Sequence, residues 1–259
     1  MNRQDPPPIH WGKEIFRAHD EYGPMRVFDD GNKRYLAFDS RNEQSCAHKN
    51  FPTRLMHEYA CAMLLPLLFL QPRHITLFGL GGGTLASCLF QLLPDTQLHV
   101  VELRPRIVEI ARRFFQLPDD PRLKIEVMDA GDYLTNAAPG STDLLLSDMY
   151  FADIMDAQQQ QTRFLESCHQ ILSPQGWLAL NYSDRAECTE TAMNVFMQRF
   201  AEVRCCSVPS GNEVIFAGRS IIPHTERELM DRCKSLNNQL GFPVTRFVKR
   251  WGRLARNGI

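Results

Sequence analysis

The sequence predicts an α/β protein with a doubly wound, mostly parallel sheet and a small antiparallel β region at the N-terminus. Five apolar segments of strand length alternate with helical segments between residues 75 and 182, as in parallel sheets covered on both faces. A glycine-rich turn separates the first of these strands from its helix. Near the N-terminus, an Asp-Gly pair separates two alternating apolar runs, which is a strong hairpin signal.

The N-terminal region contains this hairpin. Asp30 and Gly31 connect its two runs within residues 25–38, so we expect antiparallel β structure over residues 1–50. Residues 51–70 then place apolar side chains at helical intervals. The apolar part of this segment has about half of the ~20 residues that a transmembrane helix needs, and Pro66 interrupts it. The segment therefore predicts a buried helix, and we expect no membrane association.

The parallel sheet and its helices follow in regular order. After the fifth strand, a helix and two strands predict an antiparallel edge, and a further helix precedes a basic tail. The expected strands cover residues 75–80, 97–103, 123–129, 141–150 and 176–182, with edge strands at 203–209 and 212–219. The expected helices begin near Thr84, Pro105, Asp132 and Gln158 and cover residues 192–200 and 226–240.

The composition is that of an ordinary globular protein without a global preference for nucleic acid or membrane. The chain has 259 residues, of which 44% are hydrophobic and 23% charged, and its formal net charge is −1. The N-terminus lacks the apolar segment of a secretory signal, which predicts a cytoplasmic protein. The eight cysteines include no CxxC pair, so we expect reduced thiols and no metal site.

The glycine turn is the first candidate binding site. Gly79, Gly81 and Gly83 follow the first parallel strand, at the edge where open parallel sheets bind their ligands. Glycines let a ligand approach the backbone and adopt positive φ without steric cost. Glu102 ends the second strand, at the spacing of an acid that accepts hydrogen bonds from ribose hydroxyls. We therefore expect the ligand to carry a ribose.

The residues at the ends of the other strands further restrict the class of ligand. The dinucleotide fingerprint fits poorly, because its third position falls on Thr84. Asp129 and Asp148 end the third and fourth strands, so successive strands bring acidic groups to one edge of the sheet. This arrangement resembles class I methyltransferase-like domains, which bind an adenosyl sulfonium.

Five motifs between about Arg41 and Tyr182 carry a more specific resemblance. They are EQS from Glu43, PRHITLFGLGGG, HVVELRPRIVEIARRFF, LPDDPRLKIEVMDAGDYL and LLLSDMY. Together they resemble the spermidine synthase family, the polyamine aminopropyltransferases. The resemblance implies a small N-terminal β region (residues 1–50) and a Rossmann-like, methyltransferase-type domain that binds an adenosyl ligand (residues 51–259). It also implies a homodimer.

The resemblance further implies roles for single residues. Asp148 would stand at the transfer site as the base that removes a proton from the incoming ammonium. Tyr150 would lie beside it, either as a hydrogen-bonding group or as a half-buried aromatic. The acceptor would be an amine or another small molecule. The donor, S-adenosylmethionine or its decarboxylated form, would contact Gln44, Gly79, Gly81, Gly83, Glu102 at the ribose, and Asp129 with Ala130 at the adenine.

Two positions depart from the family pattern. Gly82 stands where the family has an aspartate that contacts the donor's amine, and Phe151 replaces a second acid after the fourth strand. Losing two carboxylates should weaken recognition of a diamine, because a buried cation needs a charged partner. Asp153 and Asp156 follow on the next loop and could compensate, although loop acids are more often solvated.

Other polar segments have a structural interpretation. Residues 57–59 lie on the helix with which the family covers its site, and helical spacing favours Tyr59 as a core side chain. We expect residues 158–161 to be a solvated helix start. Phe247 and Trp251 alternate with basic residues in the tail, a pattern that can bind nucleic acid, but the net charge argues against it. The basic residues are Arg246, Lys249, Arg250, Arg253 and Arg256.

Three functions fit these residues. The first is a spermidine-synthase-like transferase that binds an adenosyl sulfonium or methylthioadenosine and transfers an aminopropyl group to an amine. The second is an S-adenosylmethionine-dependent methyltransferase on the same fold. The glycine at position 82 favours it, because an aspartate there would repel the carboxylate of S-adenosylmethionine. The third is a non-catalytic binding or assembly module.

Overall fold

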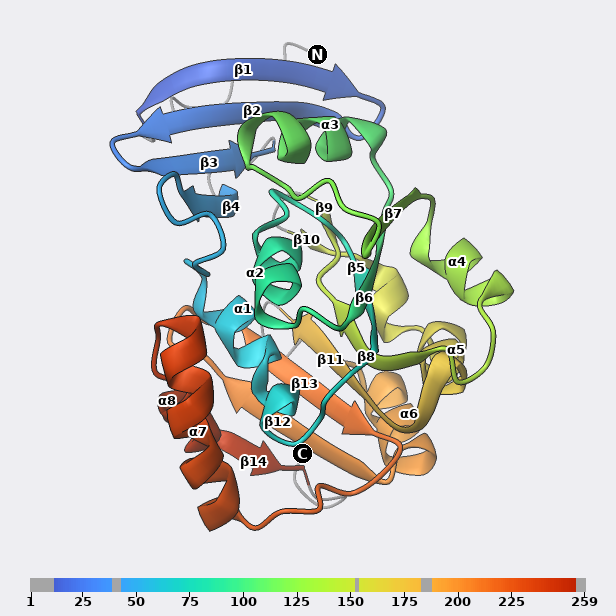
Figure 1. Cartoon of the computed structure of the whole chain (residues 1–259). Helices are drawn as coiled ribbons and strands as arrows, with labels where there is room; N and C mark the ends of the chain where they lie inside the picture. The colour runs from blue at the N-terminus through green and yellow to red at the C-terminus, as the bar shows by residue number, and fades with distance from the viewer. Residues whose placement is uncertain (1–11, 39–42, 152–153, 183–187, 255–259) are drawn as a thin grey trace.

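The computed structural model describes residues 12–38, 43–151, 154–182 and 188–254 (Figure 1). Arg41, Asp153 and Arg256, which the sequence singled out, lie outside these ranges. Among the described helices, none combines the length and the apolar character that crossing a membrane requires.

Four strands form an antiparallel N-terminal sheet: β1 (Lys13–Asp20), β2 (Gly23–Asp30), β3 (Lys33–Ala37) and β4 (Glu43–His48). The predicted hairpin is confirmed, because Asp30 pairs with Lys33 across the turn between β2 and β3. Met25, Val27 and Leu36 on this sheet belong to the same apolar cluster as the main body of the protein. The division of the chain at residue 50 stays a prediction.

The larger sheet confirms the predicted doubly wound, mostly parallel architecture. Its described strands are β5 (His74–Phe78), β6 (Gln97–Glu102), β7 (Leu123–Val127), β8 (Thr142–Ser147), β11 (Leu172–Tyr182), β12 (Glu202–Ser207), β13 (Glu213–Gly218) and β14 (Trp251–Arg253). They lie in the order β14-β12-β13-β11-β8-β5-β6-β7. Five strands are parallel to one another, β11, β8, β5, β6 and β7, and β12, β13 and β14 form the antiparallel edge. Strands β6 and β7 follow on one side of β5 and strands β8 and β11 on the other, so the order of strands switches beside β5, where such sheets bind ligands.

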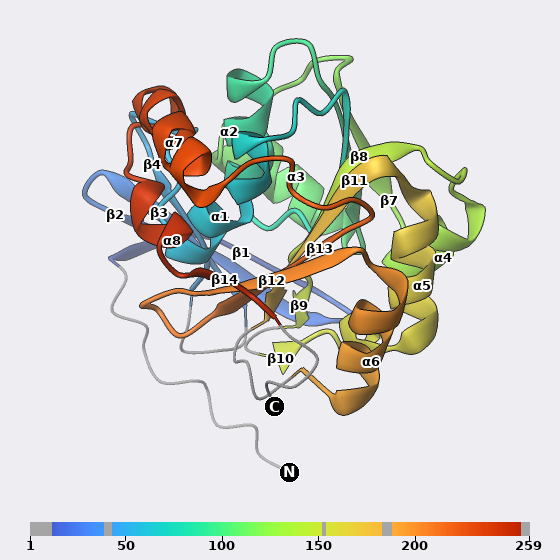
Figure 2. The same ribbon diagram turned by 90° about the horizontal axis from the view of Figure 1, so that it is seen from below.

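Helices cover both faces of this sheet (Figure 2). One face carries α4 (Ala130–Asn136), α5 (Thr162–Ile171) and α6 (Glu190–Arg199). The other face carries α1 (Glu58–Met63), α2 (Thr84–Leu92), α3 (Pro105–Phe114), α7 (Glu226–Leu240) and α8 (Thr245–Val248). Alternate residues of β8 supply the two cores: Leu144 and Leu146 join one and Leu145 joins the other. This alternation explains why the strand is apolar throughout.

Short elements complete the chain after β8 and α1. A two-stranded ribbon, β9 (Tyr150–Phe151) with β10 (Ile154–Met155), leads into the 3-10 turn η2 (Ala157–Gln160). The expected long helix over residues 51–70 is wrong: only α1 and the 3-10 turn η1 (Leu65–Leu68) form there. Pro66 lacks the N–H group that would continue α1, which explains the break.

The basic tail does not present its aromatic residues to solvent. Phe247 and Trp251 are buried, and Trp251 begins β14, which pairs with β12. Arg246 forms an ion pair with Glu58, with 3.0 Å between Nη1 and Oε1. The two rings stabilise the antiparallel edge of the sheet, so they cannot stack on bases.

Candidate functional site

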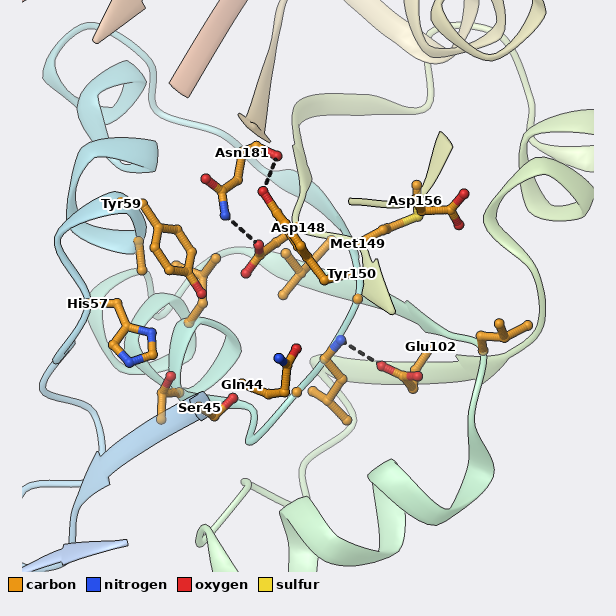
Figure 3. Close-up of a pocket in the computed structure, with 18 of the residues that line it drawn as sticks. Gln44, Ser45, His57, Tyr59, Glu102, Asp148, Met149, Tyr150, Asp156 and Asn181 are labelled. Carbon is orange, nitrogen blue, oxygen red and sulfur yellow. Dashed lines mark hydrogen bonds between the residues drawn. The ribbon is translucent and has the colours of Figure 1, made fainter. Parts of the chain in front are cut away.

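A cavity of about 780 Å³ opens at the carboxyl ends of β5 and β8, where the strand order reverses (Figure 3). The glycine turn after β5, the end of β6 and the start of α4 form one wall. Strand β4 of the N-terminal sheet and α1 form the opposite wall. The site therefore lies between the two sheets.

The glycine turn brings backbone to the cavity surface. Gly79 and Gly81 have φ values of 84° and 53°, the left-handed region that glycine tolerates best. A Cβ atom at Gly79 would collide with the carbonyl of Asp148, and one at Gly81 would lie 2.6 Å from Ser45 Oγ. Both glycines line the cavity. Gly83 does not line the cavity among the described residues: it caps α2 with φ of 74° and packs against Leu117, and its contact with a ligand stays a prediction.

Gly82 is buried behind the turn rather than in the cavity wall. Its N–H group donates to Ser45 Oγ at 2.8 Å, which joins the turn to β4. A Cβ atom at this position would lie 2.9 Å from Phe115 Cδ1 and 3.0 Å from Ser45 Cβ. The absence of an acid here is therefore built into the packing, since the neighbouring atoms leave no room for a carboxylate.

Glu102 is only 7% exposed and both of its oxygens are bonded to backbone. Oε2 accepts from the N–H of Leu80 at 2.8 Å, and Oε1 accepts from the N–H of Arg104 at 2.9 Å. Burial raises the pKa of Glu102, and these backbone hydrogen bonds oppose the shift. The carboxylate thus fixes the glycine turn while it lines the cavity. Its remaining lone pairs can accept hydrogen bonds from a ligand.

Asp129 and Ala130 lie at the cavity edge where α4 begins. Asp129 caps the helix, because its Oδ1 accepts from the N–H of Gly131 at 2.7 Å and of Asp132 at 3.1 Å. Its Oδ2 accepts from Gln158 Nε2 at 2.8 Å. The side chain of Asp129 therefore has a fixed orientation before any ligand arrives.

The glutamine run is not a solvated helix start, and that prediction is wrong. Residues 157–160 form η2, and Gln159 is fully buried. Its Oε1 accepts from Ser147 Oγ at 2.6 Å, and its Nε2 donates to the carbonyl of Met149 at 3.1 Å. Asp156 lines the cavity, and burial raises its pKa, so it is not a solvated loop acid. The glutamine segment therefore stabilises the loop that follows β8.

Asp148 lies at the centre of the site, with Tyr59 and Asn181 pointing toward it (Figure 3). Asn181 Nδ2 donates to Asp148 Oδ1 at 2.8 Å, and the Tyr59 hydroxyl also donates to the carboxylate. Burial raises the pKa of Asp148; both donors and the nearby His57 oppose the shift. Tyr59 packs against the apolar core, as its helical spacing predicts, but it also lines the cavity, where its hydroxyl bonds Asp148.

Tyr150 contacts Asn181, the hydrogen-bond partner of Asp148. Its hydroxyl donates to the backbone carbonyl of Asn181 at 3.1 Å. Asn212, on the turn between β12 and β13, donates from Nδ2 to Asn181 Oδ1 at 3.1 Å, which fixes the amide orientation. Asn181 follows the same rule that singled out Asp129 and Asp148, since it ends a parallel strand, and that rule would have found it.

The cavity wall is rich in acids. Arg104 is tied to Asp20 at 2.7 and 3.0 Å, and its guanidinium lies 4.6 Å from the ring centre of Phe38. His57 Nε2 lies 3.3 Å from Glu43 Oε1. The described side chains include no cluster of three or more groups that could hold a metal ion. Among the described residues, two basic side chains line the cavity, Arg104 and His57, and six acids do so, namely Glu43, Glu58, Glu102, Asp129, Asp148 and Asp156.

The chain is similar to bacterial enzymes named polyamine aminopropyltransferase. It is 32% identical to that of Chromobacterium violaceum over 234 residues, which cover 87% of this chain and 88% of the relative. It is 31% identical to that of Neisseria meningitidis serogroup A over 249 residues, which cover 92% and 93%. A family described as a methyltransferase domain matches residues 77–180.

Solved structures agree on the fold. A probable spermidine synthase from Corynebacterium glutamicum superposes with a TM-score of 0.73 at 21% identity, over 97% of this chain and 98% of that one. Human methyltransferase-like protein 13, in complex with SAH, superposes with a TM-score of 0.59 at 23% identity, over 71% of this chain and 90% of that one. The predicted methyltransferase-like Rossmann fold with a small antiparallel sheet is confirmed. The sequence identities to the bacterial relatives show that the chain belongs to the polyamine aminopropyltransferase family.

Proposed function

We propose that the protein transfers an aminopropyl group from decarboxylated S-adenosylmethionine to a small amine. The observation that carries this proposal is the acidic cavity, whose described lining has six carboxyl groups and two basic side chains. Decarboxylated S-adenosylmethionine carries a sulfonium and an ammonium group, whereas its parent also carries a carboxylate. A wall of this charge favours the donor without the carboxylate, because opposite charges attract strongly where water is excluded.

The donor's nucleoside would lie across the glycine turn. Glu102 would accept hydrogen bonds from the ribose hydroxyls, since it ends β6 and keeps unused lone pairs toward the cavity. Gly79 and Gly81 would let the ligand contact backbone. Asp129 and Ala130 would face the adenine at the start of α4. These roles, and that of Gln44 on the opposite wall, are proposed from position and family membership.

Asp148 would be the base of the transfer. Asp148 takes a proton from the ammonium group of the incoming acceptor, and the freed nitrogen lone pair attacks the carbon beside the sulfonium. A C–N bond forms, the C–S bond breaks, and its electron pair returns to sulfur. The products are methylthioadenosine, the alkylated ammonium and the proton held by Asp148. Tyr59 and Asn181 hold this carboxylate in place. Tyr150 acts through Asn181, because its hydroxyl bonds the backbone of that residue.

Calorimetry and a transfer assay test the proposal. Decarboxylated S-adenosylmethionine and methylthioadenosine should both release heat on binding, and methylthioadenosine should accumulate when the donor is mixed with the correct amine. A panel of mono- and diamines of different length would identify the acceptor. The proposal fails if none of the adenosyl compounds binds.

A methyltransferase is the second candidate, favoured by the absence of a carboxylate at Gly82 and by the family match over residues 77–180. Tighter binding of S-adenosylmethionine than of its decarboxylated form would select it. A non-catalytic module would bind a nucleoside without turnover of any donor. The cytoplasmic location and the homodimer stay predictions, the latter testable by light scattering.

A further inference from the structure

Strand β4 turns three consecutive side chains to the cavity. Residues 43–45 all line it, although successive side chains of a regular strand point to opposite faces. The pairing of β3 with β4 explains this exception. Leu36 pairs with Ser45 and Ala37 pairs with Glu43, so Gln44 is an extra residue that makes a β-bulge. Bulges reorient side chains near binding sites.

The bulge is fastened to the glycine turn. Ser45 Oγ accepts from the N–H of Gly82 at 2.8 Å and lies where a Cβ of Gly81 would be. Glu43 is two residues before this anchor and lines the same cavity. The residue is therefore held by the bulge on the side of the cavity where β4 meets the glycine turn.

One oxygen of Glu43 is available to a ligand. Oε1 lies 3.3 Å from His57 Nε2, while Oε2 accepts no hydrogen bond from the described residues. The Glu43 side chain is 34% exposed, which fits a group that borders an open cavity.

Glu43 also lies near the reacting end of the cavity. The charges of Glu43 and Asp148 both contribute to raising the pKa of Tyr59, although burial is the main cause. Tyr59 bonds Asp148, and its ring centre is 5.5 Å from that of His57. Glu43 is therefore connected to Asp148 through His57, which it contacts at 3.3 Å, and through Tyr59.

We infer that Glu43 supplies the carboxylate for the ammonium group of the decarboxylated donor. The N-terminal sheet thus provides, through a β-bulge, the contact that the glycine turn has no room to make. The inference rests on the proposed function, because it names the recognition element of the same donor. Three other acids of the cavity bond groups that hold the fold together: Glu58 bonds Arg246, Glu102 bonds the N–H of Leu80, and Asp148 bonds Asn181.

Glu43→Gln tests this inference with two ligands. Methylthioadenosine has the nucleoside and sulfur of the donor but no ammonium, so it reports the rest of the site. We expect Glu43→Gln to lower the affinity for decarboxylated S-adenosylmethionine by about 10- to 100-fold, which is the effect of losing a hydrogen bond between charged groups. Methylthioadenosine should bind within about twofold of the parent protein, which also shows that the variant is folded.

Glu14→Gln is the matched control. It removes the same charge from the same sheet, but Glu14 bonds Arg17 and does not line the cavity, so both ligands should bind as to the parent protein. If Glu43→Gln binds the decarboxylated donor as tightly as the parent does, the inference is wrong and the proposed function stands. If the parent protein binds neither compound, both are wrong.

Discussion

Replacing Gly82 by aspartate would give the glycine turn the acid that the family pattern has there. The structure predicts damage rather than improved donor binding. The new Cβ would lie 2.9 and 3.1 Å from two ring carbons of Phe115 and 3.0 Å from Ser45 Cβ. Phe115 is buried, so its ring has little freedom to move aside.

The size of the effect follows from two contributions. Overpacking a filled site typically costs about 1–3 kcal/mol. A carboxylate placed among these carbon atoms would also lack a cationic partner, which adds on the order of a few kcal/mol. A total near ~3 kcal/mol corresponds to a fall in Tm of about 6–12 °C for a chain of this size.

Thermal unfolding of Gly82→Asp and Gly82→Ala, followed by circular dichroism, separates these contributions. The alanine variant adds the Cβ without the charge, so its Tm should fall by less than that of the aspartate variant. Calorimetry on the same proteins should show no gain in affinity for decarboxylated S-adenosylmethionine over methylthioadenosine. An aspartate variant as stable as the parent, with a stronger preference for the decarboxylated donor, would refute the packing argument.

Three further substitutions test the proposed roles. Asp148→Asn should lower the rate of aminopropyl transfer by about 10²- to 10⁴-fold, the usual contribution of a general base, while methylthioadenosine still binds by calorimetry. Tyr59→Phe removes a hydrogen bond that lowers the pKa of Asp148, so the pKa rises further and the acidic limb of the pH–rate profile moves to higher pH. Glu102→Gln places an amide N–H₂ against backbone N–H donors, so methylthioadenosine affinity should fall by about 10-fold or more and Tm should decrease.

Each of these expectations has a contradicting result. Full transfer activity in Asp148→Asn would exclude this residue as the base. An acidic limb that stays in place in Tyr59→Phe would mean that another group controls it. Unchanged nucleoside affinity in Glu102→Gln would show that the ribose is bound elsewhere.

The sequence by itself determined the succession of strands and helices along the chain and the edge of the sheet at which the site lies. The alternation of strands and helices, the glycines after β5 and the acids ending β6 and β8 are local patterns. Such patterns can be recognised in the sequence because strand length, helix periodicity and turn type depend on residues that are neighbours in the chain. For the same reason Glu102 and Asp148 were identified before any contact was known.

Only the tertiary structure decided which side chains meet in the cavity. Tyr59 had the spacing of a core residue, yet α1 directs its hydroxyl to Asp148. Gln158 had no assignable chemistry, yet it bonds Asp129. Gly83 matched the glycine pattern, yet it faces Leu117. These contacts join segments far apart in the chain, and hydrophobic packing of the two sheets, which acts on the whole molecule, fixes their positions.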